Sequence, residues 1–190
     1  MRLFLRLSAP YLAIGVFWCI FANAWMAILA YHAQILVWSG GSLARLQRPR
    51  PARTVLLGLP SLLVGPLLYA LLPHMTRGDL SHWLANHHLS GTLLVVMIPY
   101  YGIIHPIFEQ IHWAPLREKT PLAHLAFAGY HVLVLYSLLT PPWLILCFGV
   151  LATASFVWQR MTARTTSLAV PIVSHVLADL GVVVVARLRA

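Results

Sequence analysis

The sequence predicts an all-α membrane protein, a polytopic bundle of about six transmembrane helices. Hydrophobic residues make up 60% of the 190 residues and charged residues only 9%, whereas soluble globular chains have about 45–50% apolar and 25% charged residues. The chain also carries 13 Lys and Arg against 4 Asp and Glu. Because these cations lie between long apolar stretches, they indicate contact with anionic lipid and a positive-inside bias rather than nucleic-acid binding.

The expected helices follow from the gaps between charged residues. Long uncharged stretches run from Arg6 to Arg45, Arg53 to Arg77, Asp79 to Glu109 and Lys119 to Arg160. The last stretch is interrupted at Pro141 and Pro142, since two successive prolines cannot continue a helix. The predicted spans are 11–37, 55–73, 90–110, 121–139, 142–159 and 168–187. We expect residues 1–190 to form a single membrane domain.

The first span and the loops set the expected topology. Met1–Trp25 mimics a signal peptide, with Ala22-Asn23-Ala24 as a small-residue cleavage site. We expect a long first transmembrane helix instead, because the apolar character continues to Trp38. The odd-numbered loops hold Arg45, Arg48, Arg50, Arg53, Arg117, Lys119, Arg160 and Arg164. The even loops and termini hold fewer cations, which predicts that both termini lie outside.

Two of the 4 acidic residues lie within predicted helices, where an ionisable group usually faces the bundle interior. Glu109 closes the third helix, and Asp179 lies inside the sixth, four residues after His175 and on the same face. His131 lies inside the fourth helix. Because successive helices alternate in direction, all four groups are expected in one half of the bilayer. A carboxylate and two imidazoles at one depth can activate water and stabilise an oxyanion; the alternative is a structural polar contact between helices.

The other histidines allow two further interpretations. Several are expected at the membrane interface: His32, His74, His82, His87, His88 and His124. His105, Glu109 and His112 are spaced i, i+4 and i+7 along one helical stripe, and His and carboxylate side chains bind zinc. Pro106 disturbs this helix, so the metal site is the less favoured alternative. We expect no cofactor at the main site.

Three segments of the second half resemble the motifs of one known family. Residues 164–179 read RTTSLAVPIVSHVLAD, which is similar to the family's Ser-Leu, Pro-Ile and H-x-x-x-N/D pattern. FAGYH at 127–131 matches F-x-x-x-H, and EQIHWA at 109–114 lies where E-E-x-x-x-R is expected. These segments resemble the CPBP group, the CAAX-processing and bacteriocin-processing (Abi) intramembrane endopeptidases. The resemblance covers residues 105–187.

The resemblance implies a hydrolase of peptide bonds that needs no metal. In the family, the first glutamate and first histidine activate a water molecule, while the second histidine and its Asn or Asp partner stabilise the oxyanion. By position, Glu109 and His131 would be the base pair, with His175 and Asp179 on the oxyanion side. The implied substrate is a membrane-associated peptide or protein. The implied location is the lipid bilayer as a multi-pass protein, expected in a bacterial inner (cell) membrane.

Two positions depart from the family pattern. Gln110 replaces the second glutamate and cannot accept a proton as a carboxylate does. Ala114 stands at the motif arginine, and Arg117 lies three positions further along, beyond Pro115. These departures leave open a catalytically impaired family member that acts as a membrane scaffold or regulator. A metal-binding membrane protein is the third alternative.

Overall fold

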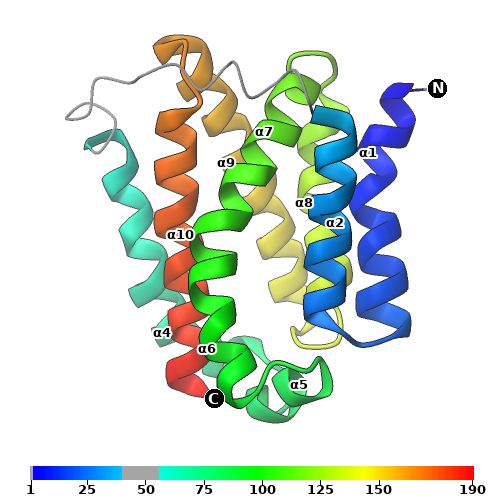
Figure 1. Ribbon diagram of the computed structural model, residues 1–190. Helices are drawn as coiled ribbons and strands as arrows, with labels where there is room; N and C mark the ends of the chain where they lie inside the picture. Colours follow the sequence, from blue (N-terminus) through cyan, green and yellow to red (C-terminus); the bar gives the residue numbers. More distant parts are fainter. Residues whose placement is uncertain (1, 40–55) are drawn as a thin grey trace.

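The computed structural model describes residues 2–39 and 56–190 and confirms the all-α prediction (Figure 1). Within these residues no strand forms apart from an isolated bridge between Thr76 and Leu139. The helices are α1 Arg2–Ala13, the π-helix η1 Ile14–Ile20, α2 Ala24–Ser39, the 3₁₀-helix η3 Leu59–Leu63, α4 Val64–Met75, α5 Leu80–Asn86, α6 Gly91–Pro99, the π-helix η4 Tyr100–Ile104, α7 His105–Arg117, α8 Leu122–Leu135, α9 Pro141–Thr165 and α10 Ala169–Arg189.

The long helices have the length and composition of membrane spans. Within the described residues, five helical runs are long and apolar enough to cross a membrane: Arg2–Ile20, Leu56–Met75, Gly91–Arg117, Pro141–Thr165 and Ala169–Arg189. The shorter apolar helices α2 and α8 run alongside them (Figure 1). Phe4, Val37 and Ile145 are among many large apolar side chains that remain exposed on the bundle. Such a surface fits contact with lipid, so the chain is a helical membrane protein.

The prediction of one helix over 11–37 is wrong, because the chain turns back between η1 and α2. Ala22 has a positive φ of 49°. The side chain of Asn23 accepts a hydrogen bond of 2.9 Å from the backbone N–H of Met26 and thereby caps α2. The N–H of Ala24 donates to the carbonyl of His87 at 3.1 Å, which ties this turn to the end of α5. The first predicted span is therefore a pair of antiparallel helices.

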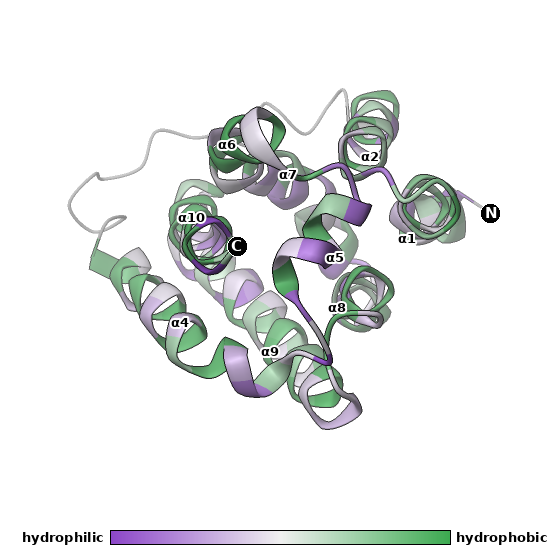
Figure 2. Cartoon of the chain, turned by 90° about the horizontal axis from the view of Figure 1, so that it is seen from below, coloured by the Kyte–Doolittle hydropathy of each residue, from purple (hydrophilic) through white to green (hydrophobic). Residues whose placement is uncertain are grey.

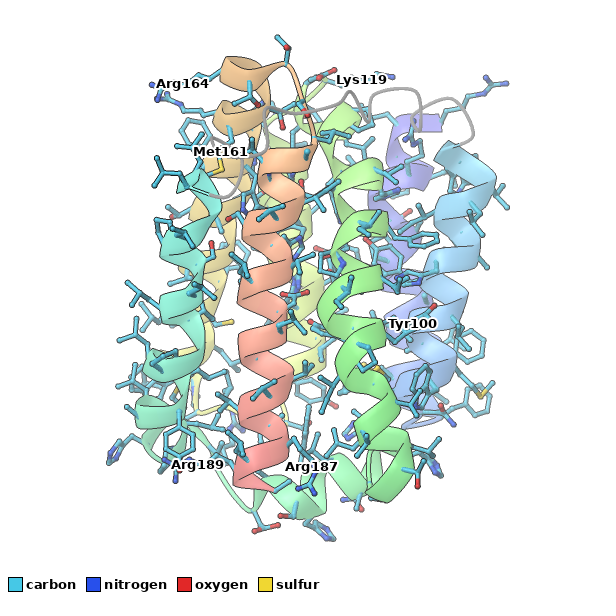
Figure 3. The ribbon with its side chains drawn as sticks, turned by 60° about the vertical axis from the view of Figure 1, so that its left-hand side comes forward. Tyr100, Lys119, Met161, Arg164, Arg187 and Arg189 are labelled. Carbon is cyan, nitrogen blue, oxygen red and sulfur yellow. The ribbon has the colours of Figure 1, made fainter. Side chains whose placement is uncertain are left out.

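The additional helix places the two termini at opposite ends of the bundle (Figure 1). The prediction that both termini lie on one side is therefore wrong. Figure 3 shows Lys119 and Arg164 at one end of the bundle, with Arg187 and Arg189 at the other. The predicted loop cations Arg45, Arg48, Arg50 and Arg53 lie outside the described residues.

The third predicted helix, 90–110, continues to Arg117 because α6, η4 and α7 form one helical run. In a regular α-helix the ring of Pro106 would clash with the carbonyl of Gly102. The chain instead forms the π-helix Tyr100–Ile104 directly before this proline. Gly102 lies against α10, where an added Cβ would come within 2.4 Å of the Leu180 side chain. Glu109 thus lies in the interior of the run rather than at its end.

Helix α10 packs against α4, α6, α7 and α9 and so connects most of the bundle. At Gly181 an added Cβ would lie only 2.8 Å from the backbone nitrogen of Gly65, so small residues let α4 and α10 approach closely. The predicted spans 55–73, 121–139, 142–159 and 168–187 correspond to Leu56–Met75, α8, α9 and α10. Seen from below, the short helix α5 lies across the lower end of the bundle (Figure 2).

Candidate functional site

A buried polar network lies in the bundle between α2, α7, α8 and α10. Its centre is Glu109 on α7, whose residue surface is 0% exposed. Gln110 and His112 are equally buried, and His175 and Arg117 are each 3% exposed. A polar group removed from water is costly unless it is hydrogen-bonded within the protein, so the partners of each atom define what this network can do.

Two tyrosines hold one oxygen of the Glu109 carboxyl group. Tyr31 of α2 donates a hydrogen bond of 3.1 Å to Oε1, and Tyr130 of α8 donates to the same atom. The indole N–H of Trp113 in turn donates to the Tyr31 hydroxyl at 2.8 Å. Because that hydroxyl accepts from Trp113, its own proton is directed to Glu109. These hydrogen bonds set the orientation of the carboxyl group in this structure.

The other oxygen of Glu109 faces two imidazoles. Oε2 lies 3.5 Å from Nε2 of His105 and 3.5 Å from Nε2 of His175. It is buried, and within the described residues it has no hydrogen-bond partner. Oε2 is therefore the carboxyl oxygen whose lone pairs remain available to accept a proton.

A chain of donors sets the tautomer of His175. Arg117 donates from Nη1 to Oε1 of Gln110 at 2.8 Å. Since a guanidinium has only donors, this contact orients the amide so that its nitrogen faces His175 at 3.1 Å from Nδ1. Nδ1 then accepts, and the proton of the neutral ring lies on Nε2. This Nε2 lies 3.5 Å from Oε2 of Glu109 and 3.4 Å from Oδ2 of Asp179.

Arg117 is fixed by further contacts. Its Nε donates to the hydroxyl of Ser155 at 2.8 Å, and its guanidinium lies over the rings of Phe127 and Trp158 at 5.3 and 5.7 Å. Trp158 also stacks on His175, with ring centroids 4.1 Å apart. Arg117 thus contacts Gln110 from the same helix, although it lies three positions beyond the motif arginine.

His131 joins the network through its neighbour in the chain. Its Nδ1 donates to the carbonyl of Phe127 at 2.8 Å, and its Nε2 lies 3.1 Å from the Tyr130 hydroxyl. Tyr130 also contacts Glu109, as described above. Tyr130 therefore links the predicted site residues His131 and Glu109 by hydrogen bonds. The other two, His175 and Asp179, lie beside Glu109 with nitrogen–oxygen separations of 3.5 Å between Glu109 and His175 and 3.4 Å between His175 and Asp179.

The histidine stripe on α7 does not converge. His105 faces Glu109, but Nε2 of His112 donates to the backbone carbonyl of Arg6 at 3.1 Å. Among the described residues, no group of three or more His, Cys, Asp or Glu side chains is arranged to hold a metal ion. The predicted alternative site at His105, Glu109 and His112 therefore lacks a converging ligand set in this part of the chain.

His32 corrects the expectation that it lies at the membrane interface. It is 3% exposed, and its Nε2 lies 3.0 Å from Nδ1 of His105. Its Nδ1 lies 2.9 Å from the hydroxyl of Tyr100. Together with Tyr31 and Tyr130, it is one of the network residues that sequence reasoning missed. The available signal was a polar residue within an apolar helix, which by itself does not indicate its partners.

An apolar cavity of about 290 Å³ reaches the network from the end of the bundle that α5 covers. Trp18, Leu84 and Leu138 are among its many apolar lining residues. His105, Tyr130 and His131 also line it, but Glu109, His175 and Asp179 do not. Of the four predicted site residues, only His131 therefore faces this cavity.

No known protein family, no curated protein and no solved structure matches this chain. The functional inference therefore depends on the side-chain network and on the motif resemblance.

Proposed function

We propose that the chain is an intramembrane endopeptidase that hydrolyses a peptide bond of a membrane-associated peptide or protein. The observation that carries this proposal is the buried network that connects His131, Glu109, His175 and Asp179 from three different helices. It combines a proton acceptor with an imidazole donor, as general-base hydrolysis and oxyanion stabilisation require. The resemblance of these four positions to the CPBP motifs supports the same assignment.

In the proposed reaction, Oε2 of Glu109 takes a proton from water, and the resulting hydroxide attacks the peptide carbonyl carbon. The N–H at Nε2 of His175 donates to the carbonyl oxygen as negative charge develops there. Oδ2 of Asp179 lies 3.4 Å from the same nitrogen, and its negative charge would stabilise the positive charge that His175 develops as a donor. The C–N bond then breaks, and the leaving nitrogen takes up a proton.

Gln110 supports activity rather than its loss. It stands where the family has a second glutamate, but here its amide donates to Nδ1 of His175. A carboxylate could not make this contact to an unprotonated nitrogen. Glutamine at position 110, in place of the family's second glutamate, therefore helps to hold His175 as a donor. Glu109 remains the proton acceptor.

The cavity indicates the class of substrate. Its lining is mostly apolar, and the polar side chains that line it include His105, Tyr130 and His131. Pockets of this kind favour an apolar group with a few polar atoms at one end. We therefore assign the cavity to an apolar segment of the substrate that places its scissile carbonyl near the histidines.

We propose an orientation in a bacterial inner membrane from the distribution of the cations. The described cations Arg2, Arg6, Lys119, Arg160 and Arg164 belong to the end of the bundle that holds the N-terminus, whereas Arg77, Arg187 and Arg189 belong to the other end (Figures 1 and 3). Cytoplasmic loops carry the excess of Lys and Arg. We therefore place the N-terminal end in the cytoplasm.

The proposal is tested with Glu109→Gln in proteoliposomes of phosphatidylethanolamine and phosphatidylglycerol. The probe is a set of internally quenched peptides, each anchored by an apolar helix, with cleavage products identified by mass spectrometry. Glutamine keeps the acceptor for both tyrosines but cannot act as a base, so the cleavage rate should fall by about 10²–10⁴. Glu118→Gln, in an exposed position just beyond α7, is the matched control and should cleave at the original rate.

Equal cleavage by the Glu109→Gln and unsubstituted proteins would refute the proposal. Cleavage should also persist in the presence of EDTA, because the proposed base is Glu109 rather than a metal-bound hydroxide. Loss of cleavage in EDTA with recovery in zinc would transfer the assignment to a metal site.

One observation favours a scaffold or regulator as the second candidate function. Glu109 is 0% exposed and does not line the cavity, as expected if the network serves only to hold helices together. A scaffold predicts that Glu109→Gln, expressed at the normal level, leaves partner binding and any cellular phenotype unchanged. If the chain is a peptidase, Glu109→Gln should abolish both the cellular phenotype and the cleavage products.

A further inference from the structure

Within the described residues, the hydrogen-bonded connection between Glu109 and His131 runs through the hydroxyl of Tyr130. We propose that Tyr130 transfers a proton between the buried carboxyl group of Glu109 and the imidazole of His131. The inference rests on the proposed function for its catalytic meaning. The transfer itself follows from the donors and acceptors and can be tested without any substrate.

The backbone fixes one nitrogen of His131. The carbonyl of Phe127 can only accept, so Nδ1 of His131 carries a proton in every state of this contact. The charge of the ring therefore depends on Nε2 alone, the atom that faces Tyr130 at 3.1 Å. His131 therefore gains or loses a proton only at Nε2.

The single proton of the Tyr130 hydroxyl allows two arrangements. In one, the protonated Glu109 donates to the phenol oxygen, and the phenol donates to a neutral His131. In the other, a protonated His131 donates to the phenol oxygen, and the phenol donates to an ionised Glu109. Moving one proton along each of the two hydrogen bonds converts the first arrangement into the second. Tyr130 is neutral in both, and the net change is one proton transferred from Glu109 to His131.

The cavity explains why such a transfer is needed. Glu109 is 0% exposed and is absent from the cavity lining, whereas Tyr130 and His131 both line it. A proton taken up by Glu109 thus has a hydrogen-bonded path to a group that faces the cavity. In the proposed hydrolysis, Oε2 takes up the water proton, and the carboxyl group then turns about its Cγ–Cδ bond so that the new O–H faces the phenol of Tyr130. The proton passes through Tyr130 to His131, which delivers it to the leaving nitrogen. Glu109 is again ionised at the end of the cycle.

The chain offers a matched control for Tyr130. Tyr31 also donates to Oε1 of Glu109, but its second polar contact is with Trp113 rather than with a histidine. Tyr130→Phe removes the hydroxyl while it retains the ring that lies parallel to Trp113, 6.2 Å away. Tyr31→Phe removes an equivalent hydrogen bond to the carboxyl group and leaves the path to His131 intact.

The decisive measurement is the ¹⁵N NMR titration of Nε2 of His131 in purified protein, with Glu109→Gln as the perturbation. If Tyr130 couples the two groups, Glu109→Gln should displace this titration by more than about one pK unit, the size of a strong site–site interaction. The displacement should be retained in Tyr31→Phe and reduced to less than half in Tyr130→Phe. An equal displacement in all three backgrounds would overturn the proposal.

The kinetic measurement separates this inference from the proposed function. Cleavage of the quenched peptides should fall by about 10- to 100-fold in Tyr130→Phe and by clearly less in Tyr31→Phe, which also removes a hydrogen bond to Glu109 but leaves the path to His131 intact. Coupling in the NMR titration without any cleavage would reject the peptidase but keep the transfer, whereas cleavage without coupling would reject the transfer alone. If the Tyr130→Phe variant does not fold, replacement of Tyr130 by 3-fluorotyrosine serves instead, because it retains the hydroxyl and the packing. An unchanged His131 titration in the 3-fluorotyrosine protein would also count against the transfer.

Discussion

The two sides of Glu109 differ in the freedom of their hydrogen bonds. On the α10 side, Arg117 orients Gln110, and Gln110 fixes the tautomer of His175. On the α8 side, Tyr130 and His131 can share their protons in two arrangements. One imidazole is thus held as a permanent donor, while the other can change its charge. The comparison shows how two histidines beside one carboxyl group can perform different tasks.

The largest effect is expected from the loss of Arg117, which orients Gln110 on the α10 side of Glu109. Arg117→Ala leaves Oε1 of Gln110 and the Ser155 hydroxyl without their charged donor and opens space beside Phe127 and Trp158. We expect a loss of about 3–5 kcal/mol in unfolding free energy, measured by denaturant titration in detergent. Arg164→Ala, at an exposed position, is the control and should change stability by less than about 0.5 kcal/mol. An equal loss of unfolding free energy in both variants would show that the contacts of Arg117 with Gln110 and Ser155 do not stabilise the protein.

A second prediction targets the tautomer of His175. Gln110→Glu can still accept from Arg117 but can no longer donate to Nδ1 of His175. We expect a proton to appear on Nδ1, which ¹⁵N NMR of the imidazole detects directly. The cleavage rate should fall by about tenfold or more because the fixed donor toward the substrate is lost. An unchanged Nδ1 signal would mean that the amide of Gln110 does not set the tautomer.

A third prediction concerns the cavity, which reaches only the α8 side of the network. Ala186 lines it from α10, and Ala186→Phe would occupy part of its volume. The KM for the anchored peptides should rise by about tenfold, as expected when a pocket loses room for an apolar group. Val184→Phe, on the exposed face of the same helix, should leave KM unchanged. The same KM in both variants would place the substrate elsewhere.

The smallest effect on the cleavage rate is expected at Asp179, which lies beside His175 on α10. Asp179→Asn keeps an oxygen that can accept from Nε2 of His175, 3.4 Å away in the structure. The motif resemblance also allows either residue at this position. We expect cleavage to fall by less than about tenfold. A loss comparable with that of Glu109→Gln would show that the charge of Asp179 takes part in the reaction.

Much of the fold was predictable because charges are so rare in this chain. Gaps between charged residues locate the long apolar helices, and two prolines mark the start of α9. The turn between η1 and α2 was missed because it contains no charge, proline or glycine. Its signal was Asn23, a favoured helix-capping residue, which lies in a segment that also mimics a cleavage site. Local sequence was therefore compatible with a continuous helix as well as with a turn.

The sequence predicted that the four site residues lie at one depth, but it predicted a contact between two side chains only where both lie on one helix. His175 and Asp179 are separated by one helical turn, and the structure places their side chains 3.4 Å apart. Tyr31 and Tyr130 contact Glu109 from other helices, 78 and 21 residues away in the chain. Such contacts depend on helix packing, which periodicity does not specify. Gln110 and Arg117 are i and i+7 on α7 and share a helical face, so their contact could have been predicted from the sequence.

The reversal of the chain at Phe21–Asn23 also bears on how the protein enters the bilayer. The helices before and after it, Arg2–Ile20 and α2, form an antiparallel hairpin whose tip carries no charged side chain. Arg2 and Arg6 lie at the start of its first helix, and the next cation in the sequence is Arg45. In the proposed orientation, with the N-terminus in the cytoplasm, insertion of this hairpin would translocate only the uncharged tip, so no charged side chain would cross the hydrocarbon layer.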